Sequence, residues 1–321
     1  MDLIYSNASR KDLGVLHDYT LDLAFGTDEN DFECRIPADA HCCGAGFYLY
    51  IEGTEYGGIV DCIASDTESK EVTYSGRTWH GILNSKVIEP EPGEDYLVVS
   101  GEANEVIATL LVRMGLSALF AASADDSGMT VNKYKIHRYI PVYDGICKML
   151  SSIGGKLRLS YNGEKVILSA ETAHDYSRDE EFDSDQVDFV AKRNFNTVNH
   201  LICLGRGELA DRTVIHLFAD VNGNISYEQS QFGLAEYAAV YDFSSVESEE
   251  ELERGGRERL AALWKASEMS VNFDADADAY DVGDIVGAID NITGISVSSE
   301  ITKKIVTITN GHTNISYKVG D

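Results

Sequence analysis

The sequence predicts an α+β protein, mainly β, in which two small antiparallel β-barrel domains flank a mixed α/β lobe. Short stretches of alternating apolar and polar residues, typical of half-buried strands, fill both ends of the chain. Apolar residues at helical spacing lie between them. Turn-forming Asn-Gly pairs separate several strand candidates. The predicted domains are residues 1–88, 89–186 and 187–321.

Residues 1–88 have the pattern of an antiparallel sheet. Apolar and polar residues alternate at 32–36 and at 47–51, so that one face of each strand points inward. Five or six short strands in such a span are typical of a small barrel or sandwich. Further strand candidates are residues 14–25, 59–64 and 70–74.

The middle lobe follows residues 89–95, where two prolines and four acidic residues mark the first boundary. Apolar residues at helical spacing then predict a helix from Val106 to Met114, and a second helix begins at Pro141 and ends at Gly154. The dipeptide Asn162-Gly163 predicts a tight hairpin between strands at 156–161 and 165–169.

A second acidic run, residues 179–185, marks the start of the third domain. One helix, at about 246–268, interrupts its strands, and Ser248 and Glu251 have the spacing of a helix N-terminal capping box. The pattern also predicts that Gly283 occupies a turn with positive φ, so that Gly283→Val disturbs this domain more than Asp276→Ala. Strands are predicted at 198–204 and 212–219, and Asn-Gly hairpins at 222–223 and 310–311, the latter joining 301–309 to 313–319.

The composition is that of an acidic globular protein. The chain has 321 residues with 26 Lys and Arg against 54 Asp and Glu, which gives a formal charge of −28 and excludes a basic nucleic-acid clamp. No run approaches the ~18 apolar residues of a membrane helix, and residues 1–6 lack the pattern of a signal peptide. We therefore expect a soluble protein made in a cytoplasm.

The cysteines show no metal or redox pattern, since none of the six stands in a CxxC pair. We interpret them as reduced and mostly buried thiols, with disulfides in a secreted product as the alternative. His41, Cys42 and Cys43 are the one local cluster of soft ligands, but adjacent cysteines point in divergent directions. The cysteines are Cys34, Cys42, Cys43, Cys62, Cys147 and Cys203.

No catalytic, cofactor-binding or metal-binding residue is predicted. Asp274, Asp276 and Asp278 resemble the start of a calcium loop, but Ala279 and Ile285 stand where that loop needs Gly and Glu. We interpret these aspartates as solvated acidic surface, with a weak cation site as the alternative. Residues 154–156 (GGK) lack the other residues of a phosphate loop, and no serine-hydrolase or zinc-protease motif occurs.

Several segments carry a resemblance to a known family. Residues 47–60 (FYLYIEGTEYGGIV), 72–78 (VTYSGRT) and 81–83 (GIL) resemble the first barrel of phage tail-hub proteins, the baseplate hub components of siphophages, prophages and related injection machines. Residues 4–5 (IY), 13–15 (LGV), 280–286 (YDVGDIV) and 301–302 (IT) agree with it.

The resemblance implies a structural protein of the virion tail, assembled in the cytoplasm of the bacterial host. It implies a homotrimeric ring with two related barrels per subunit, matching a hexameric tail tube and enclosing a DNA channel. The implied partners are the tail tube or distal tail protein and the tip, spike or fibre proteins, with no cofactor. The charge of −28 agrees with a channel that must not bind DNA.

The sequence is also compatible with two other functions. A tail-associated cell-wall hydrolase, a glycosidase or a peptidase, is one, because two catalytic carboxylates can be hidden among 54 acids. Since the sequence ends at Asp321, soon after the second predicted barrel, we expect no separate hydrolase domain. The other is a carbohydrate-binding receptor module, suggested by 17 tyrosines and 2 tryptophans that can stack on sugars.

Overall fold

The computed structural model describes residues 2–178, 181–183, 189–193, 196–246, 248–264, 267–275, 280–309 and 311–320. The chain forms two compact units. Unit 1 contains Met1–Phe189, Ser270–Asn291 and Ser298–Asp321, and unit 2 contains Val190–Met269 and Ile292–Val297. The predicted class, α+β and mainly β, is confirmed. The two closed barrels and the three-domain division stay predictions, because no described sheet is seen to close on itself.

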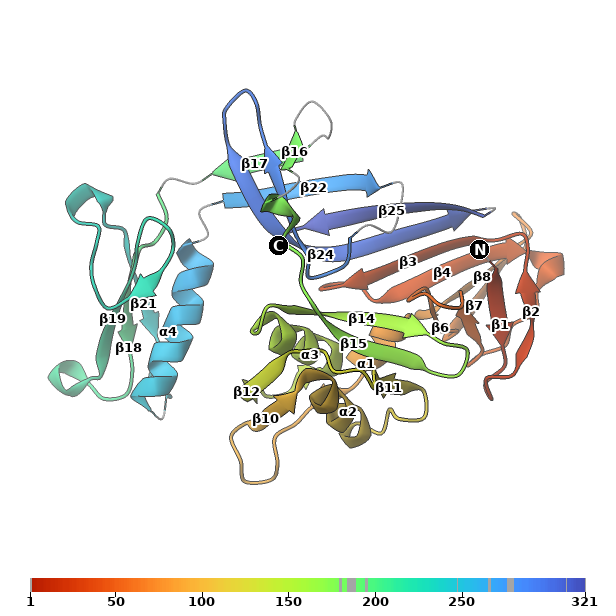
Figure 1. Ribbon diagram of the computed structural model, residues 1–321, viewed down its shortest axis with the longest axis horizontal. Coiled ribbons are helices and arrows are strands. Elements are labelled where there is room, and N and C mark those ends of the chain that lie inside the picture. The colour runs from red at the N-terminus through yellow and green to blue at the C-terminus, as the bar shows by residue number, and fades with distance from the viewer. Residues whose placement is uncertain are drawn as a thin grey trace. The chain divides into compact units, whose positions relative to one another are not determined.

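The large sheet of unit 1 joins strands from both ends of the chain (Figure 1). From β22 its order is β22-β25-β24-β3-β4-β8-β7, and the central pair places Leu23 opposite Val306. The predicted pairing of 301–309 with 313–319 is confirmed as β24 and β25. The strands of this sheet are β3 (Thr20–Gly26), β4 (Asp31–Pro37), β7 (Cys62–Asp66), β8 (Glu71–Arg77), β22 (Ser267–Ala275), β24 (Ser296–Thr309) and β25 (His312–Val319), to which β16 (Glu181–Asp183), β17 (Phe189–Arg193) and β23 (Ile285–Ile289) are joined.

The middle lobe packs against the N-terminal strands through one hydrophobic core. Trp79 is buried there and stacks on Tyr161 with ring centroids 5.6 Å apart, while Tyr50 lies 4.4 Å from the same ring. The four-stranded sheet β2-β1-β5-β6 contributes to this core. Its strands are β1 (Leu3–Ser6), β2 (Asp12–Leu16), β5 (Tyr48–Tyr50) and β6 (Gly57–Ile59).

Both predicted helices of the lobe are confirmed. The Glu102 carboxylate caps the first by accepting a hydrogen bond from Glu105 N at 2.9 Å, and its apolar face is buried. The predicted hairpin through Asn162-Gly163 is confirmed too, with Tyr161 paired to Val166. The elements are α1 (Trp79–Asn84), α2 (Ala103–Arg113), α3 (Val142–Ser151), β9 (Val87–Ile88), β10 (Leu97–Glu102), β11 (Phe120–Ala122), β12 (Thr130–Ile136), β13 (Ile140–Pro141), β14 (Gly155–Tyr161) and β15 (Val166–Thr172).

Unit 2 is a four-stranded sheet, in the order β20-β19-β18-β21, with one helix along one face (Figure 1). The predicted helix is confirmed as α4, and Ser248 Oγ accepts a hydrogen bond from Glu251 N at 3.2 Å. Leu201, Leu217 and Leu252 lie in the core between sheet and helix. The elements are β18 (His200–Leu204), β19 (Val214–Ala219), β20 (Ile225–Ser226), β21 (Ala238–Asp242) and α4 (Glu249–Trp264).

Two details differ from the sequence-based expectation. Residues 14–25 form two strands rather than one, because the chain turns at 17–19 between β2 and β3. The short helix α1 was not predicted, since six residues are too few for a helical period; Thr78 Oγ1 caps it by accepting from Gly81 N. Within the described ranges, no helix is long and apolar enough to span a membrane.

Candidate functional site

An acidic groove lies on the open face of the large sheet. Alternate residues of a strand point to opposite faces, so Leu21 and Leu23 face the core and Asp22 faces the groove. The strand register then places Asp22 opposite Glu33, and Glu33 opposite Ser75, in one row across three strands. The groove has a volume of about 760 Å³.

Negative charge dominates this groove. Five carboxylates and two guanidinium groups line it. Arg77 donates hydrogen bonds to Asp61 from its backbone N and its guanidinium group, with Nε 2.8 Å from Asp61 Oδ2. These hydrogen bonds lower the pKa of Asp61. Thr307 Oγ1 donates to Asp22 Oδ1 at 2.6 Å. The groove is therefore suited to repelling a polyanion. The charged lining residues are Asp22, Glu29, Asp31, Glu33, Arg35, Asp61 and Arg77.

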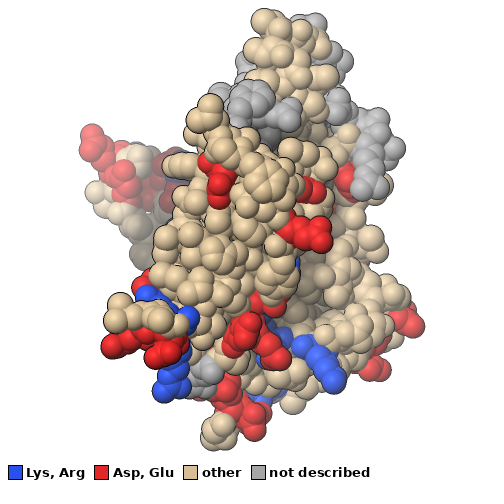
Figure 2. Space-filling view, turned by 90° about the vertical axis from the view of Figure 1, so that its left-hand side faces the viewer, with Lys and Arg blue, Asp and Glu red and all other residues tan. Residues whose placement is uncertain are grey.

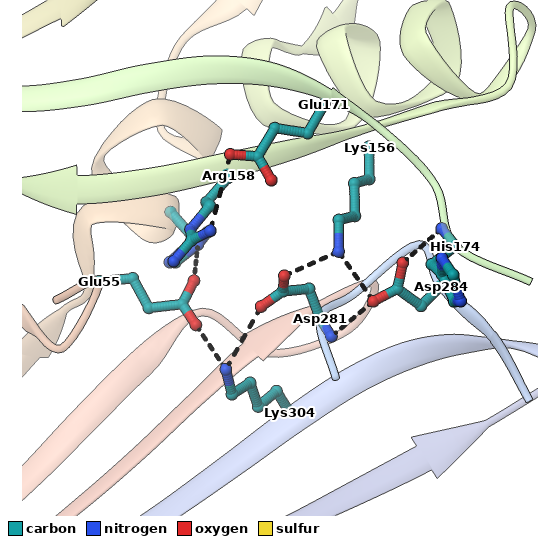
Figure 3. A network of polar contacts seen from close by, with 9 residues as sticks. Glu55, Lys156, Arg158, Glu171, His174, Asp281, Asp284 and Lys304 are labelled. Atoms are coloured by element: carbon teal, nitrogen blue, oxygen red, sulfur yellow. Dashed lines mark hydrogen bonds and ion pairs between the residues drawn. The ribbon is translucent and has the colours of Figure 1, made fainter. Parts of the chain in front are cut away.

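A second charged cluster is buried inside unit 1 (Figure 3). Lys304 is fully buried, and its Nζ lies 2.8 Å from Glu55 Oε1 and 3.6 Å from Asp281 Oδ1. Lys156 Nζ lies 2.7 Å from Asp281 Oδ2 and 2.8 Å from Asp284 Oδ2. Each lysine thus stands between two carboxylates, so the buried charges are compensated.

This ionic cluster connects segments that are far apart in the sequence. Glu55 comes from the loop between β5 and β6, Lys156 from β14 and Lys304 from β24. Asp284 Oδ1 also accepts a hydrogen bond from His174 N at 2.8 Å, and Asp284 Oδ2 accepts one from Asp281 N at 2.9 Å. The cluster therefore holds the 281–284 turn against the lobe and the large sheet.

The ionisation of the cluster follows from these contacts. Burial alone raises the pKa of Glu55, but Lys304 and His80 outweigh it and lower the pKa to about 2. Burial alone lowers the pKa of Lys156, but its hydrogen bonds to Asp281 and Asp284 raise it overall. Both groups are charged at neutral pH, so the cluster is suited to structural support rather than to proton transfer.

Sequence reasoning missed the ionic cluster, although one signal for it was present. Lys304 alternates in phase with Val306 and Ile308, which are both buried. A lysine on the inward face of a strand needs a buried carboxylate partner, because an unpaired buried charge is very costly. The prediction that Gly283 has positive φ is confirmed, with φ at 99°.

His41, Cys42 and Cys43 meet at one hydroxyl group. Tyr74 Oη accepts hydrogen bonds from Cys42 N at 3.0 Å and Cys43 N at 3.2 Å, and lies 2.8 Å from His41 Nδ1. Burial raises the pKa of Cys43, and it raises the pKa of Cys34 to about 12. These buried thiols are poor nucleophiles at neutral pH.

Of the remaining sequence candidates, Lys156 of the 154–156 stretch belongs to the ionic cluster, and the aspartates at 274–278 lie wholly or partly outside the described residues. The side chain of Asp274 and all of Asp276 and Asp278 fall outside the described residues. Gly154 follows α3 and has φ at 75°, the left-handed conformation in which glycine commonly terminates a helix. Across the part of the chain that the structure describes, no three His, Cys, Asp or Glu side chains converge as a metal site would require.

Comparison with known proteins is informative at the level of the fold. No protein-family model matches the sequence, and a search of curated proteins finds no match either. Solved structures do match, over the whole chain. A prophage MuSo2 43 kDa tail protein from Shewanella oneidensis has a TM-score of 0.60 at 12% identity, covering 100% of this chain and 98% of its own.

The chain has the fold of phage tail proteins. A tail protein from Neisseria meningitidis matches with a TM-score of 0.56 at 12% identity, covering 100% of this chain and 96% of its own. A prophage tail protein from Listeria monocytogenes matches with a TM-score of 0.53 at 10% identity, covering 99% and 94%. The tail-protein fold therefore includes both units.

Proposed function

We propose that the chain is a structural hub protein of a phage or prophage tail. Three copies form a ring that joins the tail tube to the tip or baseplate and surrounds the DNA channel. The fold match carries this proposal, because it extends over the whole chain of three proteins that are themselves named tail proteins. The proposed partners are further copies, the tail tube or distal tail protein, and the tip, spike or fibre proteins.

The acidic groove supports the channel part of the proposal. A protein that neutralises DNA phosphates releases counterions and so holds the duplex in place. A surface with five carboxylates against two guanidinium groups does the opposite. We therefore assign the open face of β3, β4 and β8 to the channel, where it lets DNA slide without binding.

Mass measurement in solution, followed by particle imaging, tests the ring. Light scattering at increasing concentration, alone and with the purified tail-tube protein, is expected to give three copies per particle. Images of those particles are expected to show a central opening. A chain that stays monomeric under both conditions would contradict the proposal.

The absence of an enzymatic role belongs to the same proposal. The ionic cluster has its carboxylates neutralised by lysines, and the groove is an open face of a sheet rather than a deep cleft. Incubation with purified peptidoglycan is expected to release no soluble fragments. Turnover of peptidoglycan would instead support the cell-wall hydrolase.

A further inference from the structure

The helix α4 covers only one face of the unit 2 sheet, and six of the nine paired side chains on the other face are apolar. Leu201, Cys203 and Leu217 point to α4 and are fully buried. Their neighbours along each strand point to the opposite, open face. The apolar side chains of that open face are Ile202, Leu204, Val214, Phe218, Ala238 and Val240.

The register brings these side chains together in rows. Ile202 lies between Val240 and His216, and Leu204 lies between Asp242 and Val214. Val240 is 62% exposed and Val214 is 45% exposed. A sheet with one solvated face normally alternates apolar and polar residues, whereas near-continuous apolar strands are typical of sheets covered on both faces. The open face, with His200, His216 and Asp242 as its polar members, is therefore more apolar than the solvated face of a sheet normally is.

A loop extends this apolar surface beyond the sheet. Residues 227–237 connect β20 to β21, and Glu236 Oε1 lies 2.6 Å from His200 Nδ1, which fixes the loop beside the open face. Asn199 Nδ2 donates to Ala235 O at 2.7 Å and holds the same end. The exposed large apolar side chains of this loop are Tyr227, Phe232, Leu234 and Tyr237.

The open face is also poor in net charge. Asp242 Oδ1 accepts from Arg212 Nη2 at 2.5 Å, and Glu236 contacts His200. The surface in the middle of Figure 2, which looks onto this face, is mostly uncharged, and charged side chains gather toward its lower edge. In a chain whose formal charge is −28, such a neutral apolar face is unusual.

We propose that a neighbouring copy of this chain covers the open face of the unit 2 sheet in the assembled ring. Two copies that each carry −28 repel one another across a charged surface, and contact through a neutral face avoids most of that repulsion. A partner of opposite charge would instead favour a face rich in carboxylates. In a closed ring of three, the contact is head to tail, so each copy offers this face once.

The size of the face fits the centre of such a contact. Strands lie ~4.8 Å apart and rise ~3.3 Å per residue, so three five-residue strands present roughly 240 Å². A standard interface buries ~800 Å² per partner. The aromatic side chains of the 227–237 loop, Tyr227, Phe232 and Tyr237, widen the surface and are of the residue types that dominate binding energy.

This inference rests on the proposed ring, and the decisive experiment compares two matched variants. Val240→Glu places a carboxylate in the middle of the open face, whereas Val112→Glu places one on α2 of unit 1, where Val112 is 70% exposed. Analytical ultracentrifugation is expected to show wild type and Val112→Glu as trimers at the same concentration. Val240→Glu is expected to need a roughly tenfold higher concentration to assemble. Val240→Thr, which keeps the β-branched shape, provides a milder second variant, and near-ultraviolet circular dichroism checks that each variant folds.

Each outcome decides a different point. A wild type that never assembles would contradict the ring and this inference together. A wild-type trimer with an equally stable Val240→Glu trimer would contradict the inference and leave the ring intact. If Val240→Glu and Val240→Thr melt earlier but assemble normally, the cover comes from the same chain. If they assemble normally but lose only the binding of a tail-tube protein, the cover is that partner.

Discussion

The large sheet of unit 1 and the sheet of unit 2 each have a covered face and an open face, but the open faces differ. On β4, Glu33 and Arg35 occupy the open positions, whereas on β18 the same positions hold Ile202 and Leu204. The open face of unit 1 carries charge, and that of unit 2 is mostly apolar. In our proposals, this difference in side-chain chemistry separates a surface that repels DNA from one that binds a protein.

The largest effect is expected for Lys304→Met, which leaves Glu55 as a buried charge with His80 as its remaining partner. Removing one partner of a buried ion pair costs about 3–5 kcal/mol of unfolding free energy. Urea unfolding measures it, with Lys318→Met as the control, because Lys318 is exposed on β25. The double variant Glu55→Gln with Lys304→Met is expected to recover part of the loss. A Lys304→Met protein as stable as the control would show that unit 1 does not depend on its ionic cluster.

A smaller effect is expected from acid, because protonated Glu55 loses its charge but can still accept the hydrogen bond from Lys304 Nζ. The folded pKa of Glu55 is about 2, below its unfolded value of about 4.3, so its contribution to stability is complete above pH ~4.3 and is lost as pH falls toward 2. Thermal melting between pH 6 and pH 2 measures it. Glu55→Gln is expected to flatten this part of the curve, whereas Glu105→Gln on the exposed face of α2 is not. Parallel curves for wild type and Glu55→Gln would assign the acid sensitivity to other carboxylates.

Gly283→Val is expected to cost about 2–3 kcal/mol. Gly283 has φ at 99°, and a Cβ there would lie 2.9 Å from Lys156 Cβ, beside the ionic cluster. Gly294→Val is the matched control, because Gly294 has φ at 68° with no atom within 4 Å of a Cβ. Equal melting temperatures for the two variants would show that backbone strain, rather than the close contact with Lys156, causes the loss of stability. The larger effect relative to Asp276→Ala stays a prediction.

The smallest change in stability, about 1 kcal/mol, is expected for reversing charges in the acidic groove, chiefly from loss of the hydrogen bond that Thr307 donates to Asp22. The triple variant Asp22→Lys, Asp31→Lys, Glu33→Lys is expected to bind duplex DNA with strong salt dependence, whereas wild type is expected not to bind. Lysines at Glu89, Glu94 and Glu105 give a control with the same total charge. Gel shift across a salt series compares them. Equal DNA binding by both triple variants would show that net charge matters, rather than the groove.

The local parts of the fold could be predicted from sequence, and the long-range pairings could not. Helical spacing identified α2, a capping box identified α4 and Asn-Gly pairs identified three hairpins, because those signals lie within or next to the elements they define. Nothing local indicates that β3 pairs with β24. The contact between Lys304 and Glu55 spans 249 residues and depends on that pairing. The ionic cluster therefore required the structure, and so did the placement of Asp22 beside Glu33 on the neighbouring strand.

The pairing of β3 with β24 also affects how the protein is made. Asp22 and Thr307 are 285 residues apart, so at ~5–20 residues per second the ribosome needs roughly 15–60 s to supply the second strand. Until then, Leu21, Leu23 and Phe25 have no neighbour on that edge. A prematurely terminated chain cannot complete this sheet, so its unpaired strand edge remains accessible to chaperones and proteases. Only finished polypeptides can then form the complete sheet.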